Sequence, residues 1–421
     1  MTRKIEIIVG ILTLMLWILP TNGQDGGAEP AAPVPKTTTS AAKKVEEASK
    51  PKGDVEDARV SFIQMTNLRA LGKEFEGADY ILWSQDGKKL LVDRRYIDKR
   101  TDALEIDVTS EAVKNLSVGR SGGGFRYNNG APAWNPKEKG CVFVGQSEKS
   151  KDYSRSIPSN GQQCNLWYYN ENNGKYTTLT NYQLSFTNPR GVAMPRFSAD
   201  GKQLFWCGAD GIKGNTFWGQ RALFVADFVS GSIPRLRNIK KLQPSDNHDF
   251  YESYGFTPDG KKLLFVAPFG KDTPWYASDI CLMNVDGTEV QNLTNTTQVW
   301  DRYPALSPKG KKIIWSSSDG FEIAYLGIGG NRWQLELKSE LWIMNSNGQD
   351  KRQLTRFNRR GTGHSLLVNG RRAYVGMTAW NPDGKQIAFV VYYDQTLSGS
   401  MDGLLSRVFV ADLVESNVYN D

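Results

Sequence analysis

The densest group of side chains that could bind a metal or move a proton lies in the segment 246–252, DNHDFYE. Its carboxylates and imidazole are chemically able to act as metal ligands or as a general base. The four residues concerned are Asp246, His248, Asp249 and Glu252. The same segment can be a loop held by turn and cap hydrogen bonds. We favour the loop interpretation over a metal site.

Recognisable catalytic motifs are absent from the sequence. The chain has only two histidines, His248 and His364, which excludes zinc sites built from several histidines. There is no G-x-S-x-G elbow, no C-x-x-C pair and no glycine-rich phosphate loop following a strand. We therefore expect no catalytic residue, no bound metal and no cofactor.

One short phrase recurs six times and indicates the elements that must position any site. It consists of a bulky apolar residue, a Ser, Thr or Asn, usually a Pro, then an acid or Lys, Gly, Lys and an apolar strand. The copies begin at 83 (WSQDGKKL), 134 (WNPKEKGCVF), 197 (FSADGKQL), 256 (FTPDGKKL), 306 (LSPKGKKI) and 380 (WNPDGKQI). Their glycines are 50 to 74 residues apart, a spacing too variable for helical solenoids.

Each repeat also contains a second hairpin. In 256–294 the turn Pro258-Asp259-Gly260 joins two strands, and Asp286-Gly287 joins two more. The resulting unit is a blade of four antiparallel strands. Six such units, arranged around an axis, would protect the sheet edges that a single blade exposes. The sequence therefore predicts an all-β fold, a six-bladed β-propeller formed by 59–421.

The N-terminal end of this region should close the ring. The last repeat has few residues after Glu415 and lacks a complete outer strand. Residues 59–65, RVSFIQM, have a strand-like pattern and no repeat motif. We predict that they lie beside the final blade.

The repeated phrase resembles the WD40-like repeats of the TolB-type propeller family, whose usual form is P-x-W-S-P-D-G-K followed by a strand. The copies WNPDG at 380–384 and FTPDG at 256–260 match best, and the resemblance covers roughly 70–421. It implies a periplasmic, non-enzymatic protein that binds a partner through a propeller face. TolB proteins also carry a separate N-terminal α/β domain, for which 24–58 is too short and too polar, so the resemblance extends to the repeats only.

Arginine and aromatic residues recur just before the innermost strand of several repeats. By symmetry these segments converge on one face, at the mouth of the central channel, and Arg and aromatic residues commonly anchor interfaces. With the 246–252 segment they give our candidate binding residues: Arg126, Tyr127, Arg190, His248, Asp249, Tyr251, Trp300, Arg302, Tyr303, Arg372 and Tyr374. The arginines could grip carboxylates of a partner, or they could pair with acids of the blades. Both interpretations stay open.

The first 58 residues look like an export signal and a tether. Residues 1–23 combine Arg3 and Lys4 with the apolar run from Ile7 to Leu19, which is too short to span a bilayer. They predict a signal peptide, with an uncleaved membrane anchor as the alternative. Residues 24–58 are rich in Ala, Pro, Thr, Lys and Glu and predict a disordered tether.

The charge balance favours anionic partners. The signal contributes two cations and one acid, and the tether has five Lys against seven acids, so 59–421 carries +8 while the whole chain carries +7. A basic exported propeller fits an envelope or extracellular protein, or an anionic polymer. We expect a periplasmic or secreted monomer with no nucleic-acid partner. A fully solvated basic surface with no specific partner is the alternative.

The four cysteines are expected to be buried free thiols. An even number in an exported chain suggests disulfides, but Cys207 and Cys281 fall in different repeats. Cys141 and Cys164 should lie near opposite ends of their hairpin.

Two functions remain open from the sequence. The first is an exported, non-enzymatic propeller that binds a protein or an anionic envelope polymer through the channel mouth. The alternative is a propeller hydrolase or lyase that acts on a carbohydrate or peptide at the same mouth.

Overall fold

The computed structural model describes most of the chain from residue 60 onward. The described ranges are 60–72, 77–96, 100–122, 125–150, 156–185, 188–211, 220–245, 250–269, 273, 276–323, 336–394 and 404–418. The predicted signal peptide and tether lie outside them. The residues from Arg59 to Asp421 form one compact unit. Among the described residues, no helix is long and apolar enough to cross a membrane.

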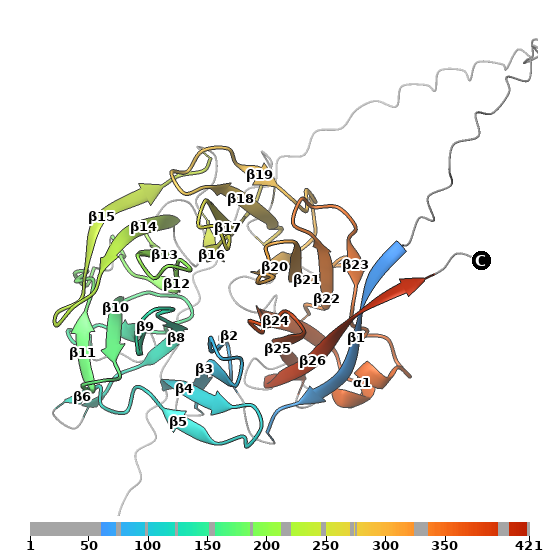
Figure 1. The fold of residues 1–421 in the computed structure, drawn as a ribbon, viewed down its shortest axis with the longest axis horizontal. Helices are drawn as coiled ribbons and strands as arrows, with labels where there is room; N and C mark the ends of the chain where they lie inside the picture. Colours follow the sequence, from blue (N-terminus) through green and yellow to red (C-terminus); the bar gives the residue numbers. More distant parts are fainter. Residues whose placement is uncertain are drawn as a thin grey trace, which may run out of the picture. The chain divides into compact units, whose positions relative to one another are not determined.

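Six four-stranded antiparallel sheets are arranged around an axis as the blades of a propeller (Figure 1). Blade 1 contains β2 (Ile81–Trp83), β3 (Lys89–Arg95), β4 (Thr101–Asp107) and β5 (Val113–Asn115). Blade 2 contains β8 (Asn129–Trp134), β9 (Gly140–Gln146), β10 (Cys164–Asn170) and β11 (Lys175–Thr178). Blade 3 contains β12 (Ala193–Phe197), β13 (Gln203–Ala209), β14 (Arg221–Val229) and β15 (Arg235–Leu242). Blade 4 contains β16 (Glu252–Phe256), β17 (Lys262–Ala267), β18 (Asp279–Asn284) and β19 (Gln291–Asn292). Blade 5 contains β20 (Asp301–Leu306), β21 (Lys312–Ser317), β22 (Glu340–Asn345) and β23 (Arg352–Gln353). The predicted fold class is confirmed.

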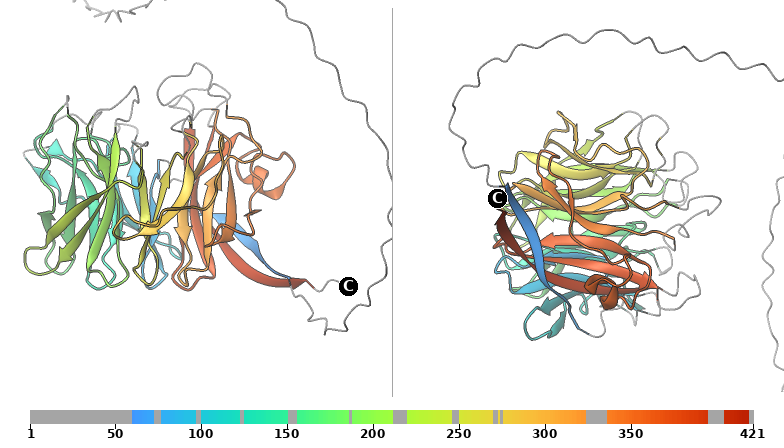
Figure 2. Two further views of the ribbon diagram at one scale, coloured as in Figure 1. Left: turned by 90° about the horizontal axis from the view of Figure 1, so that it is seen from above. Right: turned by 90° about the vertical axis from the view of Figure 1, so that its right-hand side faces the viewer.

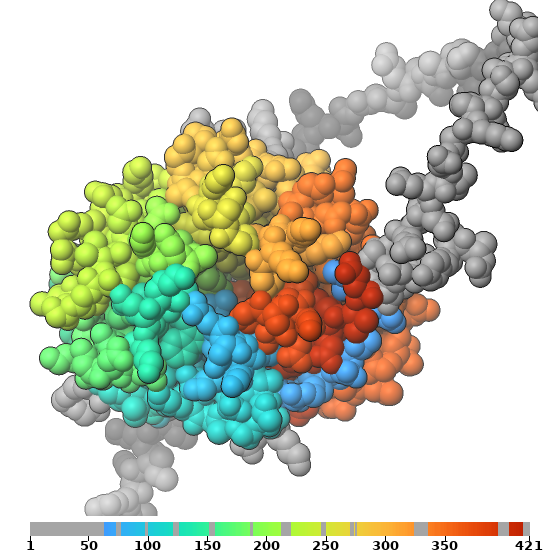
Figure 3. Space-filling view, viewed as in Figure 1, coloured from blue at the N-terminus to red at the C-terminus, as the bar shows by residue number. Residues whose placement is uncertain are grey.

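Blade 6 is built from both ends of the propeller. Its strands are β24 (Ala373–Trp380), β25 (Gln386–Asp394), β26 (Leu404–Val418) and, outermost, β1 (Val60–Ala70). Strand β1 runs antiparallel to β26, with Val60 opposite Val418 and Ala70 opposite Phe409. Figure 2 shows the two strands side by side, and in Figure 3 the first blade (blue) adjoins the last (red). The predicted closure by the N-terminal segment is confirmed.

The repeated phrase forms the tight turn between the first two strands of a blade. In blade 3 the Ser198 hydroxyl donates to Asp200 Oδ1 at 2.6 Å, and the Lys202 amide donates to the same oxygen at 3.0 Å. Gly201 follows with φ +72°, which favours glycine. The Ser198 bond and then the Lys202 amide hold the pKa of Asp200 below its usual value. The turn acid therefore serves the turn itself.

A second recurring arrangement of hydrogen bonds holds the start of the third strand in place, and the sequence analysis did not predict it. In blade 4 the Thr294 hydroxyl donates to Asp279 Oδ1 at 2.9 Å and accepts the Ile280 amide at 3.0 Å. The same arrangement joins Glu340 to Thr355. The signal is a Leu followed by Ser or Thr directly after the outer strand, as in Leu293-Thr294 after β19.

All four cysteines are buried and free, as predicted. Cys141 lies opposite Tyr169 in the β9–β10 ladder, whereas Cys164 lies opposite Gln146 at its other end. Burial raises the pKa of each thiol above its ordinary value, so the thiols stay protonated near neutral pH.

Two further elements lie outside the blades. Strands β6 (Ser121–Gly122) and β7 (Phe125–Arg126) form a short hairpin before blade 2. The single turn of helix α1 (Gly363–Leu367) precedes blade 6, and its N-cap Thr362 accepts the Ser365 amide at 3.2 Å.

Candidate functional site

The innermost strands β2, β8, β12, β16, β20 and β24 surround the axis and begin at the same end of the ring (Figure 1). We call this end the mouth face. The four predicted arginines lie there, because each precedes or opens an innermost strand. Two of them are half-exposed. The side chain of Arg126 is 33% exposed and pairs with Asp102, and that of Arg190 is 41% exposed and pairs with Asp210.

The other two arginines are largely buried. Arg302 lies inside β20 and its side chain is 7% exposed, while that of Arg372 is 11% exposed. Arg372 pairs with Asp394, and Arg302 Nε lies 3.5 Å from Glu252 Oε2. Carboxylates at the ends of the blade strands compensate these charges, so burial is tolerated. All four arginines therefore pair with acids of the blades, which is the second of the two interpretations of the sequence.

Glu252 is the centre of an ion-pair cluster that sequence reasoning did not assemble. Arg221 Nη1 lies 3.3 Å from Glu252 Oε1, so two guanidinium groups flank one carboxylate. The Tyr254 hydroxyl also donates to Glu252 Oε2 at 2.9 Å. Phe250 covers both arginines, with its ring centre 5.1 Å from Arg221 Cζ and 5.0 Å from Arg302 Cζ. This cluster joins blades 3, 4 and 5.

Three of the predicted aromatic residues meet in a continuous arc around the mouth. The ring centre of Trp300 lies 5.5 Å from that of Tyr303 and 6.3 Å from that of Tyr374, both edge-on. The arc continues to Tyr254, 6.4 Å from Tyr303, and to Tyr392, which stacks on Tyr374 at 4.6 Å. We call these five rings the aromatic arc. It spans blades 4, 5 and 6.

The remaining predicted residues do not join this arc. Tyr251 is fully buried, and its hydroxyl donates to the Ser245 carbonyl at 3.0 Å. Tyr127 is 8% exposed and lies beneath the guanidinium of Arg120. His248 and Asp249 lie outside the described residues. Within the described ranges, no three His, Cys, Asp or Glu side chains are grouped so as to hold a metal ion.

Asp79, just before β2, borders the far end of the arc. The Tyr392 hydroxyl donates to its carboxylate. Burial raises the pKa of Asp79, although the Tyr392 bond and the charge of Arg95 oppose the shift. The nearby Asp93 is 1% exposed and accepts the amides of Asp79 and Tyr80, each at 2.8 Å. Burial and then the charge of Asp79 raise the pKa of Asp93.

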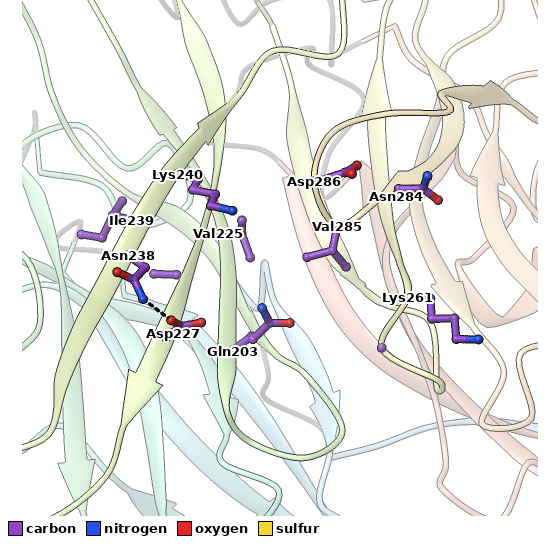
Figure 4. A pocket seen from close by; sticks show the side chains of 12 residues that line it. Gln203, Val225, Asp227, Asn238, Ile239, Lys240, Lys261, Asn284, Val285 and Asp286 are labelled. Carbon is purple, nitrogen blue, oxygen red and sulfur yellow. Dashed lines mark hydrogen bonds between the residues drawn. The ribbon is translucent and has the colours of Figure 1, made fainter.

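A separate groove of about 740 Å³ opens at the other end of the strands, between blades 3 and 4 (Figure 4). It contains none of the predicted binding residues. Val225 and Val285 provide apolar surface, and the Asn238 amide donates to Asp227 Oδ2 at 2.6 Å. Lys240 and Asp286 contribute opposite charges. The groove is therefore electrically balanced, unlike the rim of the mouth face.

Comparisons with known proteins give only distant similarities. No protein-family profile matches it. Dipeptidyl-peptidase 5 of Porphyromonas gingivalis is 26% identical over 108 residues, which are 24% of this chain and 16% of that protein. The chain thus matches less than a fifth of the curated relative's length.

Solved propeller structures are similar at low identity. TolB from Acinetobacter baumannii has a TM-score of 0.44 at 16% identity, covering 79% of this chain and 63% of that one, less than two thirds. A putative TolB from Agrobacterium tumefaciens has a TM-score of 0.49 at 17% identity, covering 86% and 100%. An oligogalacturonate lyase in complex with manganese has a TM-score of 0.43 at 14% identity, covering 85% and 96%. These likenesses concern the fold and say nothing about the site.

Proposed function

We propose that the chain is an exported, non-enzymatic binding protein, periplasmic or secreted, that binds a protein or an anionic envelope polymer through the mouth face. The observation that carries this proposal is the unbalanced charge at the rim. Arg190 and Lys241 both pair with the single carboxylate of Asp210, and their side chains are 41% and 44% exposed. Two cations on one acid leave a net positive charge facing solvent, which attracts anionic groups.

The test is partner capture from an envelope extract, using the propeller as bait. The double variant Arg190→Gln, Lys241→Gln should lose most of the captured material, since it makes the local charge negative; a circular dichroism melt checks its folding, because Asp210 loses both cationic partners. A matched control is Arg235→Gln, Arg237→Gln, which removes two exposed cations from the same blade near the opposite end of β15. Raising salt should weaken capture, because exposed charges are screened within about 8 Å at physiological ionic strength. Equal capture by both double variants would contradict the proposal.

One observation supports the enzymatic alternative, a hydrolase or lyase acting on a carbohydrate or peptide. Asp79 and Asp93 are neighbouring acids with raised pKa values beside the aromatic arc, and such shifts cluster at catalytic sites. Incubation with peptide and oligosaccharide libraries, followed by mass spectrometry, distinguishes the two functions. Turnover that disappears in Asp79→Asn would replace the binding proposal with the enzymatic one.

A further inference from the structure

Asp79 differs from Glu252 in having no cation at ion-pair distance within the described ranges, although the charge of Arg95 acts on it from further away. Glu252 is flanked by Arg221 and Arg302, and Asp93 is held by backbone amides. Within the described ranges, no Lys or Arg nitrogen lies at ion-pair distance from Asp79, and its side-chain hydrogen bond comes from the neutral hydroxyl of Tyr392. A partly buried carboxylate without a counter-charge is costly. A ligand that supplies positive charge would remove that cost.

Two tyrosines of the aromatic arc have hydroxyls without a hydrogen-bond partner among the described residues. Tyr374 is only 5% exposed, yet its hydroxyl has no hydrogen-bond partner among the described residues. Its ring lies flat on Tyr392 at 4.6 Å, and the two are register partners on β24 and β25, so the two hydroxyls lie near each other. The Tyr303 hydroxyl likewise has no partner in the described part of the chain. Tyr303 is linked to this group through Trp300, whose ring contacts both Tyr303 and Tyr374, and the charge of Asp79 contributes to raising the pKa of both tyrosines.

The ring faces of the arc add a second kind of attraction for a cation. Trp300 meets Tyr303 and Tyr374 edge-on, so the three rings form one contiguous cluster without stacking on one another. Aromatic faces attract cations by about 0.5–2 kcal/mol. A protonated primary amine fits this set of groups, because its three N–H bonds could reach one carboxylate oxygen and two hydroxyl oxygens.

We propose that Asp79, Tyr303 and Tyr374 form a binding site for a protonated primary amine, at the centre of the mouth face. This inference rests on the proposed binding function and names the group that the ligand presents: a lysine side chain or the N-terminal ammonium of a peptide. The rim cations Arg190 and Lys241 would then meet acidic groups around that amine. The ligand is accordingly a peptide or protein with an amine at its tip and acids beside it.

The first experiment uses small probes on the whole chain. Methylammonium chloride should raise the melting temperature by about 2 °C relative to sodium chloride of equal concentration, as expected of a ligand well above its dissociation constant. Tetramethylammonium, which has no N–H bonds, and potassium should raise it less. Equal effects of all four salts would overturn the proposal.

Variants then assign the effect to the site. Asp79→Asn should weaken methylammonium binding about tenfold, as loss of a charged partner does. Tyr374→Phe should weaken it about threefold, as loss of one hydrogen bond does, and should melt like the parent, because the hydroxyl has no partner to lose. Tyr168→Phe is the matched control, since its hydroxyl lies 3.2 Å from Glu138 near the opposite end of blade 2. If Tyr374→Phe binds methylammonium as the parent does, the assignment is wrong even if Asp79→Asn fails to fold.

Two peptide probes identify the source of the amine. N-acetyl-lysinamide presents a side-chain ammonium, and glycylglycinamide presents a terminal one. Binding of either supports the site and names its source; binding of neither, in calorimetric titrations sensitive to millimolar affinity, contradicts it. These titrations need no macromolecular partner, so failure of partner capture and failure of amine binding are separate results.

Discussion

The hydroxyl of Tyr392 donates a hydrogen bond to the carboxylate of Asp79, across 313 residues of sequence. Tyr392 lies on β25 of the last blade, and Asp79 lies just before β2 of the first. The backbone nearby is also joined, because the Gly77 amide donates to the Ser406 hydroxyl at 2.7 Å. The amine site that we propose is therefore located at the junction where the ring closes.

Removal of β1 should strongly destabilise the propeller. Deleting 60–66 removes most of the ladder between β1 and β26, namely the pairs from Val60 with Val418 to Thr66 with Asp412. We expect the melting temperature to fall by roughly 10 °C or more, which corresponds to a few kcal/mol in a unit of this size. Circular dichroism melts measure this. A deletion of 26–40, within the predicted tether, is the control, and an unchanged melt after loss of 60–66 would contradict the role of β1.

Stability should fall as the pH rises from about 4 to 7. Burial raises the pKa of Asp93 from 3.8 to about 7, so the folded state holds a proton that the unfolded state has already released. The contribution of this group to stability is complete below about pH 4, is lost between about pH 4 and 7, and stays constant above. Urea unfolding at pH 5 and pH 8 measures it.

The matched variant for this pH effect is Asp93→Asn, which should have a flatter profile over the same interval. Asp301 contributes with the same sign, because burial raises its pKa to about 6. Asp200→Asn serves as the control, since the pKa of Asp200 is lowered by its turn hydrogen bonds and its contribution has the opposite sign. A steeper profile for Asp93→Asn than for the parent would refute the assignment.

Replacing the two kinds of mouth arginine should have unequal effects on folding. Arg302→Gln leaves a buried cluster with one cation fewer and removes the contact over Phe250, so we expect a loss of about 2–4 kcal/mol in the free energy of unfolding. Arg190→Gln removes a half-exposed partner of Asp210, which keeps Lys241, and should cost under about 1 kcal/mol. Urea titrations compare the two, and equal losses would contradict the difference in burial.

The four thiols should be unreactive in the folded protein. Cys141, Cys164, Cys207 and Cys281 are buried and protonated, and the thiolate is the reactive form. A thiol reagent should modify none of them in buffer and all four in denaturant. Reductant should leave the melting temperature unchanged, and a reductant-sensitive melt would reveal a disulfide.

The blades could be predicted from the sequence because their signals are local. The turn at Asp259-Gly260 combines a glycine with an acid within a few residues, and six copies of the phrase, some with Lys in place of the acid, define six blades. Trp300, Tyr303 and Tyr374 were also found in this way, since they occupy corresponding places before or within the innermost strands. Local signals thus specify each blade and the end of the ring at which a site lies.

The partners within the site could not be predicted in the same way. Glu252 meets Arg221 across 31 residues, and Asp79 meets Tyr392 across 313. Such pairs depend on the angle between blades and on loop lengths, which no short motif encodes. For the same reason the burial of Arg302 was missed, because its cover, Phe250, belongs to another blade.

The composite last blade has a consequence for biogenesis. Asn67 on β1 donates to Asp412 on β26 at 2.7 Å, and 345 residues separate them. During synthesis or passage across a membrane, β1 emerges first and must wait for nearly the entire propeller before its partner appears. An unpaired strand edge is a template for wrong pairing. The nascent chain therefore has a long vulnerable interval, during which a chaperone that shields β1 would determine the yield of folded protein.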